Sequence, residues 1–253
     1  MSAAATVPAC TLSAIEAVEQ AGLASWPALE EERMDGWLLR ASRGYTRRTN
    51  SANSAGALAD RLEASLPLIE RFFVQRGLPP TFRLLSIPED EAIDDALARH
   101  GYQACDNACS VMVLTLAGHA PRSSESSHPV KPLADAKAWL REFTRIKDDA
   151  GPHQKVHLAM LQAITQPTAF AVVQAEGASS AIGCGLGVVS NGHLGLFDIA
   201  TQAVNRRQGV GTALCNGLLH WGRSQGAHTA YLQVVAHNHQ AVELYRRLGF
   251  EEL

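Results

Sequence analysis

A short stretch late in the chain combines two arginines with two glycines, in the order Arg-Arg-Gln-Gly-Val-Gly at residues 206–211. An apolar, strand-like segment at 196–200 precedes it, and a helical pattern follows it directly. Because glycine has no side chain, an anion can come close to its backbone. The free N–H groups and the dipole of a helix's first turn attract that anion, and the arginines add full positive charges. The stretch therefore predicts a pyrophosphate-binding loop.

A second pattern lies about twenty residues further along the chain. Residues 231–236 form an expected strand, Asn238 is placed to cap a helix, and Gly249 and Phe250 end that helix. The inner face of the helix would carry Ala241, Leu244, Tyr245 and Leu248. R-x-x-G-x-G followed by L-x-V-x-x-x-N-x-x-A-x-x-L-Y-x-x-x-G-F closely resembles the acetyl-CoA-binding core of the GNAT N-acetyltransferases. The resemblance covers residues 196–250.

This resemblance implies transfer of an acetyl group from acetyl-CoA to an amine, with no metal ion. It implies that a strand edge holds the pantetheine arm through backbone hydrogen bonds and that the glycine loop binds the pyrophosphate. Asn238 would contact the pantetheine arm, although a plain helix N-cap explains it equally well and both roles are compatible. The residues implied in binding are Ile199, Ala200, Thr201, Arg206, Arg207, Gln208, Gly209, Val210, Gly211, Thr212 and Asn238.

Tyr245 is the expected general acid, which would protonate the leaving thiolate. A phenol with a pKa of about 10 can donate to a thiolate of comparable basicity. The alternative is a core tyrosine on an apolar helix face. The family motif favours the catalytic role.

The general base is less well defined by the sequence. Some GNAT enzymes carry a glutamate at the position that falls on Gly195 here, and glycine offers no base. Asp198 on the same expected strand is the best carboxylate, with a structural hydrogen-bonding role as its alternative, and His193 or water are further options. His153 and His157 lie where this family often admits its acceptor, but exposed surface histidines are the simpler interpretation.

A glycine cluster at residues 183–187 suggests a dinucleotide fingerprint at first sight. That fingerprint requires a helix directly after the glycines. Here the chain continues as an expected strand toward Asn191-Gly192, which is a strong hairpin signal. These glycines are instead expected to thin a strand where a ligand or a neighbouring backbone comes close.

The composition is that of an ordinary globular protein, with 253 residues, 46% hydrophobic and 19% charged. A net charge of −3 implies no general attraction to nucleic acid or to an acidic membrane. No apolar run approaches 18 residues, and no export signal is evident, so a cytoplasmic protein is expected. The odd number of cysteines, five, without a C-x-x-C pair predicts reduced, mostly buried thiols and no metal site.

The chain divides into two expected halves around a segment rich in Ser, Pro and Gly. We expect a first domain at 1–117, a linker at 118–129 and a second domain at 130–253. The elements expected in the first half are helices at 12–23, 58–76 and 89–100 and strands at 36–41, 45–50, 81–87 and 108–116, with a loop at 50–56. Those expected in the second half are strands at 130–133, 170–174, 181–189 and 193–201 and helices around 136–143 and 155–164.

An internal repeat links the two halves. Segment 81–102 aligns without a gap on segment 229–250, and both read as strand, loop, helix and Gly-aromatic. Chance similarity between two strand–helix units is the alternative. In the first copy Asp90 takes the place of Asn238, and Leu97 takes the place of Tyr245. These replacements indicate that the first copy has lost the cofactor contact and the general acid. We therefore predict an α/β fold of two tandem GNAT-like domains, each a mixed, mostly antiparallel sheet flanked by helices, with a degenerate first copy.

The stretch GWLLRASRGYTRRTNS resembles the N-terminal half of one bacterial group of tandem GNAT proteins. The chain stops three residues beyond Phe250, so the last strand is short. It is expected either to borrow a strand from the first half or to have a trimmed end. The favoured function is an acetyltransferase acting on a small-molecule or peptide amine, as a monomer or homodimer. The alternative is an acyl-CoA-binding sensor without turnover.

Overall fold

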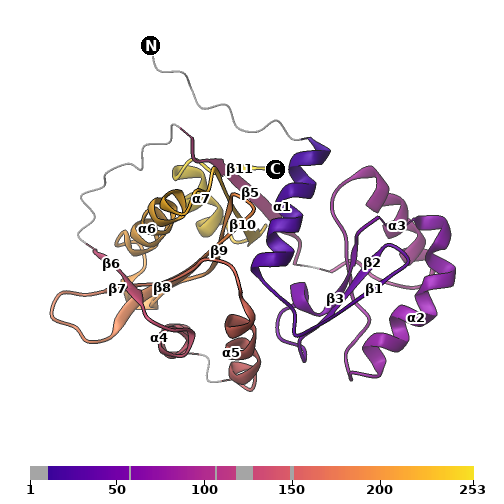
Figure 1. The fold of residues 1–253 in the computed structure, drawn as a ribbon, viewed down its shortest axis with the longest axis horizontal. Helices are drawn as coiled ribbons and strands as arrows, with labels where there is room; N and C mark the ends of the chain where they lie inside the picture. Colours follow the sequence, from indigo (N-terminus) through magenta and orange to yellow (C-terminus); the bar gives the residue numbers. More distant parts are fainter. Residues whose placement is uncertain (1–10, 57, 106, 118–127, 149–150) are drawn as a thin grey trace, which may run out of the picture. The chain divides into compact units, whose positions relative to one another are not determined.

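The structure is a computed structural model that describes residues 11–56, 58–105, 107–117, 128–148 and 151–253. It divides into two compact units. The larger unit comprises residues 1–25, 107–154 and 164–253, and the smaller unit comprises 26–106 and 155–163. Each unit has its own sheet (Figure 1).

The larger unit is built on a seven-stranded sheet with the order β11-β5-β10-β9-β8-β7-β6. Its strands are β5 (Cys109–Thr115), β6 (Val130–Leu133), β7 (Thr168–Gln174), β8 (Ala181–Ser190), β9 (His193–Thr201), β10 (Thr229–Val235) and β11 (Glu251–Glu252). β9 and β10 pair in parallel, and the other neighbouring strands pair antiparallel. Asn191 and Gly192, with φ of 49° and 74°, form the predicted hairpin turn between β8 and β9.

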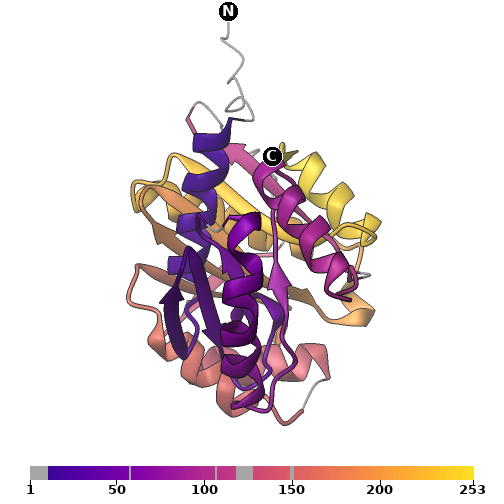
Figure 2. The same cartoon turned by 90° about the vertical axis from the view of Figure 1, so that its right-hand side faces the viewer.

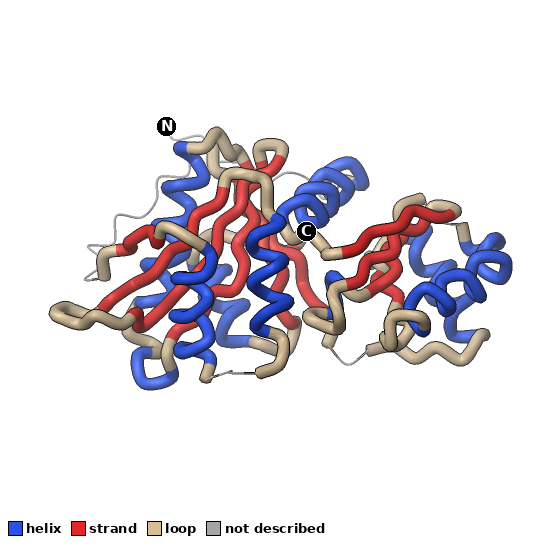
Figure 3. Tube along the Cα trace, turned by 60° about the horizontal axis from the view of Figure 1, so that its bottom comes forward, coloured by secondary structure: helices blue, strands red, loops and turns tan. Residues whose placement is uncertain are grey.

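Helices cover both faces of this sheet (Figure 3). They are α1 (Leu12–Ser25), α4 (Ala136–Lys147), α6 (Val210–Ser224) and α7 (His239–Arg247). Ala171 of β7 belongs to the core that packs with α6, while its neighbour Phe170 contacts Trp139 of α4. Because successive strand residues point to opposite faces, α4 and α6 lie on opposite sides of the sheet. Gly22 of α1 faces Tyr231, which lies on the face opposite α6.

The glycines of β8 make room for α6. A Cβ on Gly183 would lie 2.5 Å from Val210 Cγ1, and one on Gly187 would lie 3.0 Å from Leu218 Cδ2. A Cβ on Gly185 would also lie 3.2 Å from Leu218. The expectation of a close neighbour is therefore confirmed, and that neighbour is the helix that follows the glycine loop.

The short strand β11 does not pair with β10. Strand β5 lies between them and pairs with β10 from Thr229–Thr115 to Val235–Cys109 and with β11 at Glu251 and Glu252. The first alternative for the C-terminal strand is thus confirmed, because β5 comes from the first half of the sequence. The compact units accordingly divide the chain after Ser25 and before Asn107 rather than at residue 117. Most of the predicted linker, 118–129, lies outside the described residues.

The smaller unit has a four-stranded sheet with the order β1-β2-β3-β4, and helices flank it (Figure 2). Its main elements are β1 (Glu30–Met34), β2 (Trp37–Ala41), β3 (Ser51–Ser54), α2 (Leu62–Val74), β4 (Phe82–Arg83) and α3 (Pro88–Arg99). Residues 155–163 of α5 (Gln154–Ala163) also belong to it. β2 and β3 are antiparallel, α2 crosses over, and β4 is parallel to β3. Hairpin, crossover helix, parallel strand and helix recur in the same order from β8 to α7, which supports the internal repeat.

One strand and one loop predicted for the smaller unit were wrong. Residues 47–49 form a short 3-10 helix instead of a strand, and the predicted loop contains β3. The Asn50 side chain accepts hydrogen bonds from the N–H groups of Ser42 and Gly44, which holds the turn before β3. Small polar residues have low strand propensity, but pairing on both sides overrides it here. The strand expected at 81–87 has only two residues. Beyond it, the Leu85 N–H donates a hydrogen bond to the Asp90 carboxylate at 2.6 Å instead of to a neighbouring strand.

Candidate active site

The parallel strands β9 and β10 separate before they end. Their register runs from His193–Thr229 to Leu196–Leu232, yet β9 continues to Thr201 and β10 to Val235. The edge of β9 that faces β10 therefore has no strand partner over residues 197–201. Such an edge offers backbone N–H and C=O groups to an extended ligand.

A β-bulge shapes this open edge. The register of β8 and β9 passes from Cys184–Ala200 to Leu186–Phe197, so Asp198 and Ile199 together face the single residue Gly185. Asp198 has a φ of +50°, a conformation that Asp tolerates better than most residues. The indole Nε1 of Trp139 donates to the Gly185 carbonyl at 3.1 Å and so holds the backbone at the bulge. The bulge includes Ile199, the first of the three residues predicted to bind pantetheine.

The glycine loop lies between β9 and α6, as the sequence predicts. Arg207 and Gly209 both have positive φ, of 63° and 85°, and Gly209 caps α6. Among the described residues, nothing lies within 4 Å of the position where Gly209 would carry a Cβ. The first helical bond runs from Ala213 N to Gly209 O at 2.9 Å. The three preceding N–H groups of α6, at residues 210–212, have no helix carbonyl to bind and can receive an anion.

Gly211 allows helix α6 to lie close to helix α7 and to the end of strand β9. A Cβ at this position would lie 3.2 Å from Leu244 Cδ2 of α7 and 3.9 Å from Thr201 Oγ1 of β9. The end of the open strand, the first turn of α6 and helix α7 therefore meet at this glycine. Asn238 is exposed and caps α7, because its Oδ1 accepts from Ala241 N at 3.3 Å. This confirms the capping role and leaves the Asn238 Nδ2 group for another partner.

Tyr245 lies in the core between α6 and α7. Its side chain is 9% exposed, and its ring packs edge-on against Phe250 with centroids 6.0 Å apart. Burial, and then the electrostatic effect of Cys215, raise the pKa of Tyr245 above its usual value, and the phenol is protonated at neutral pH. Among the described residues its hydroxyl has no hydrogen-bond partner. This placement is compatible with both predicted roles, the core tyrosine and the proton donor.

The place of the family's glutamate is filled by other side chains. A Cβ on Gly195 would lie 2.5 Å from Phe197 Cε2 and 2.6 Å from the Tyr231 hydroxyl. Asp198 is partly exposed, and its charge adds to the burial that raises the pKa of the Cys184 thiol. His193 lies at the other end of the nine-residue strand β9, about 26 Å from Thr201 at ~3.3 Å per residue. Asp198 is therefore much nearer the glycine loop than His193.

The two predicted surface histidines differ. His153 is exposed, but His157 is only 2% exposed, so the surface interpretation was wrong for His157. Within the smaller unit its Nδ1 lies 2.8 Å from the Tyr45 hydroxyl, and its ring contacts those of Tyr45 and Trp26. Tyr45 and His157 are 112 residues apart, and no local sequence pattern indicates this contact.

The cysteines also divide into two classes. Cys184 and Cys215 are buried, whereas Cys105 and Cys109 are exposed, and Cys10 lies outside the described residues. Burial of most thiols was thus too broad an expectation. In the described part of the chain, no group of three or more His, Cys, Asp or Glu residues could hold a metal ion. Over the same residues, no helix has the length and apolar character needed to cross a membrane.

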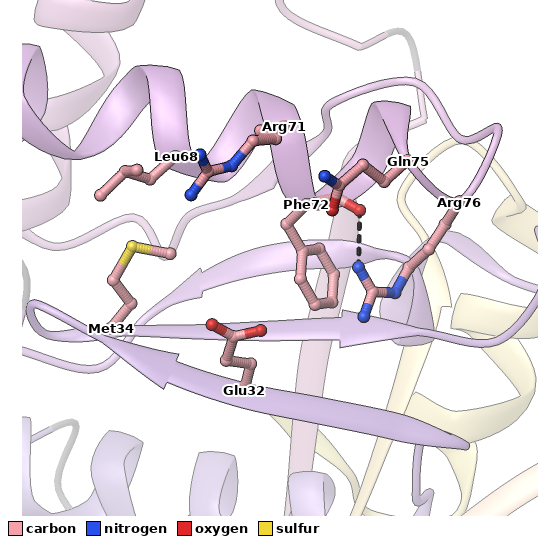
Figure 4. A pocket seen from close by; sticks show the side chains of 7 residues that line it. All are labelled: Glu32, Met34, Leu68, Arg71, Phe72, Gln75 and Arg76. Carbon is pink, nitrogen blue, oxygen red and sulfur yellow. Dashed lines mark hydrogen bonds between the residues drawn. The ribbon is translucent and has the colours of Figure 1, made fainter.

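A pocket in the smaller unit is separate from these residues (Figure 4). It lies between β1 and α2, and its lining residues are Glu32, Met34, Leu68, Arg71, Phe72, Gln75 and Arg76. Arg76 donates to the Phe72 carbonyl at 2.8 Å and pairs with Glu30 at 2.9 Å, and its guanidinium lies 3.7 Å from the centre of the Phe72 ring. The Arg76 guanidinium is therefore held by contacts within the smaller unit. None of the predicted site residues lines the pocket.

Comparison with known proteins identifies the family. The family model described as "Probable histone acetyltransferase Rv0428c C-terminal" matches residues 12–253. The "Uncharacterized N-acetyltransferase YobR" of Bacillus subtilis is 30% identical over 244 residues, which cover 94% of this chain and 95% of that protein.

Two solved structures share the fold. A GCN5-related N-acetyltransferase from Kribbella flavida superposes with a TM-score of 0.70 at 15% identity, covering 96% of this chain and 93% of that one. A tandem GNAT protein from the clavulanic acid biosynthesis pathway gives 0.60 at 12% identity, covering 80% and 72%. The family match over residues 12–253 decides between the two predicted functions in favour of the enzyme. The chain belongs to the GNAT family of N-acetyltransferases, and the protein is an acyltransferase.

Proposed function

We propose that the larger unit transfers an acetyl group directly from acetyl-CoA to an amine. The observation that carries this proposal is the open edge of β9 next to the glycine loop of α6. The pantetheine arm would lie along Ile199, Ala200 and Thr201, and the pyrophosphate would bind at residues 206–212. Asn238 has an amide group left over from capping, which can hold the arm from the side of α7.

The chemistry requires little beyond orientation and two proton transfers, since a thioester is already activated. The amine nitrogen attacks the thioester carbonyl, a C–N bond forms, and the C–S bond breaks. Tyr245, whose phenol is protonated at neutral pH, donates that proton to the departing thiolate. Asp198 takes the proton that the amine loses, because it is the carboxylate in the bulge of the open strand.

The acceptor is a primary amine on a small molecule or a peptide. The name of the matching family includes a histone acetyltransferase, so a lysine-rich peptide belongs in the acceptor panel next to small amines. The smaller unit retains the element order of the fold. However, Asp90 stands in the place of Asn238, and Leu97 stands in the place of Tyr245. The Asp90 carboxylate is buried and bound to the backbone, and we therefore assign acetyl-CoA to the larger unit alone.

Calorimetric titration with acetyl-CoA tests the cofactor site, and release of free CoA thiol across the amine panel tests turnover. The test variant is Arg206→Glu, which reverses a charge at the loop. Arg206 is exposed and has no ion pair within the described part of the chain, so the fold should not change. We expect the affinity to fall at least about 10-fold, as for a lost charge-assisted contact.

Lys137→Glu is the matched control, because it makes the same change in net charge at an exposed position of α4. It should bind acetyl-CoA like the wild type. An equal loss in both variants, or none in Arg206→Glu, would place the pyrophosphate elsewhere. Absence of binding by the folded wild type would overturn the proposal itself.

A further inference from the structure

A histidine far from the glycine loop in sequence contacts its backbone. The Nε2 atom of His128 lies 2.9 Å from the carbonyl oxygen of Gln208, 80 residues further along the chain. A carbonyl oxygen can only accept, so Nε2 carries the proton and donates. Gln208 is the residue directly before Gly209, and the bond therefore holds the peptide group that joins the two.

The orientation of this peptide group matters for an anion. In a trans peptide the C=O and the next N–H point in opposite directions. With the Gln208 carbonyl held by His128, the N–H of Gly209 must point to the other side. Gly209 has no Cβ, and no described residue packs within 4 Å of the position where one would be, so glycine's backbone freedom leaves the orientation of this peptide to its hydrogen bonds. Positive φ at Arg207 and Gly209 is the kind of backbone that forms N–H concavities for anions.

The segment that carries His128 is itself anchored. Val130 begins β6 and packs on α6, where a Cβ on Gly217 would lie 2.9 to 3.1 Å from three of its side-chain atoms. The Gln208 side chain is held separately, through a 3.1 Å bond from its Nε2 to the Val204 carbonyl. His128 thus lies two residues before a strand that packs on the same helix that the loop begins.

We propose that His128 is a positioning residue for the pyrophosphate of the acyl donor. It holds the Gln208–Gly209 peptide so that the Gly209 N–H faces the diphosphate. This inference rests on the proposed acetyl-CoA site, and it adds to that site a residue from outside the glycine motif. The imidazole acts through the backbone and need not touch the ligand.

The test compares His128→Ala with His128→Gln, whose amide can supply the lost N–H donor. Calorimetry measures the affinity for CoA and for pantetheine, which lacks the pyrophosphate. His128→Ala should weaken CoA binding about 5- to 10-fold, the effect of one ordinary hydrogen bond, and leave pantetheine binding unchanged. His128→Gln should recover most of the CoA affinity. The KM for acetyl-CoA should rise by the same factor, with kcat within about 2-fold.

The outcomes separate this inference from the proposed function. If the wild type binds CoA and His128→Ala binds it equally well, His128 does not position the loop. If His128→Ala loses CoA and pantetheine alike, the histidine has a general structural role and the inference is overturned. If the folded wild type binds no CoA, the proposed site itself is wrong and the role of His128 falls with it.

Discussion

Tyr245 is a buried phenol that stays protonated at neutral pH. Desolvation raises its pKa, so the phenol keeps its proton at every pH below its ordinary pKa of about 10. A tyrosine in this state can act as an acid and cannot act as a base at neutral pH. The role of the general base, which accepts the proton of the amine, is assigned to Asp198, and this residue is partly exposed.

At this scale the first prediction is for Tyr245→Phe. The ring and its contact with Phe250 are kept, and only the hydroxyl is lost. We expect the release of CoA thiol to slow at least about 10-fold, since proton transfer by a placed side chain contributes about 100-fold or more. The affinity for CoA should stay within about 2-fold of the wild type. Steady-state kinetics with calorimetry checks both quantities, and an unchanged rate would leave Tyr245 a core residue only.

Helix α6 and strand β8 are fitted to each other at the scale of elements. Three glycines on one face of β8 let the helix approach, and the helix in turn brings its first turn to the end of β9. The position of the glycine loop therefore depends on the absence of side chains at three positions of the neighbouring strand β8. In the proposed site, the packing of α6 and the binding of the pyrophosphate are thus coupled.

The element-scale prediction is that Gly183→Ala destabilises the protein. The added Cβ would lie 2.5 Å from Val210 Cγ1 and 3.2 Å from the Ala200 carbonyl. Overpacking of this kind typically costs about 1–3 kcal/mol of unfolding free energy. The double variant Gly183→Ala with Val210→Ala should recover part of the loss, because it removes the nearest clash. Urea denaturation of the four proteins of this cycle gives the coupling energy, and strict additivity would contradict the contact.

The sheet of the larger unit is completed by a strand from the first half of the sequence. β5 pairs with β10 along its full length and separates β10 from β11. Helix α1, from the start of the described chain, covers the face of the same sheet where Tyr231 lies. The larger unit is thus assembled from both halves of the sequence.

This arrangement predicts that residues 130–253 alone do not form the active unit. Such a fragment lacks β5 and exposes the edge of β10, a template for aggregation. We expect it to be insoluble or to bind no acetyl-CoA, and co-expression with residues 1–117 should restore both properties. A soluble 130–253 fragment with wild-type affinity would show that β5 is dispensable. Size-exclusion chromatography and calorimetry measure the two properties.

Several features followed from the sequence because their causes are local. The glycine loop, the Asn238 cap and the Asn191-Gly192 turn each depend on a few neighbouring residues, whose backbone preferences act in any context. Strand β9 was predicted with its observed bounds, since the hairpin fixes one end and the loop the other. The motif pair around residues 196–250 was enough to name the family.

Other features depend on contacts between distant residues, and only the tertiary structure decided them. β3 is a strand through pairing on both sides, against the low strand propensity of Ser-Ala-Asn-Ser. The pairing of β5 with β10, the burial of His157 against Tyr45 and the bond from His128 to Gln208 join segments about 80 to 120 residues apart. No pattern within one segment specifies its partner in another, because such contacts are stabilised only after the chain has folded around them.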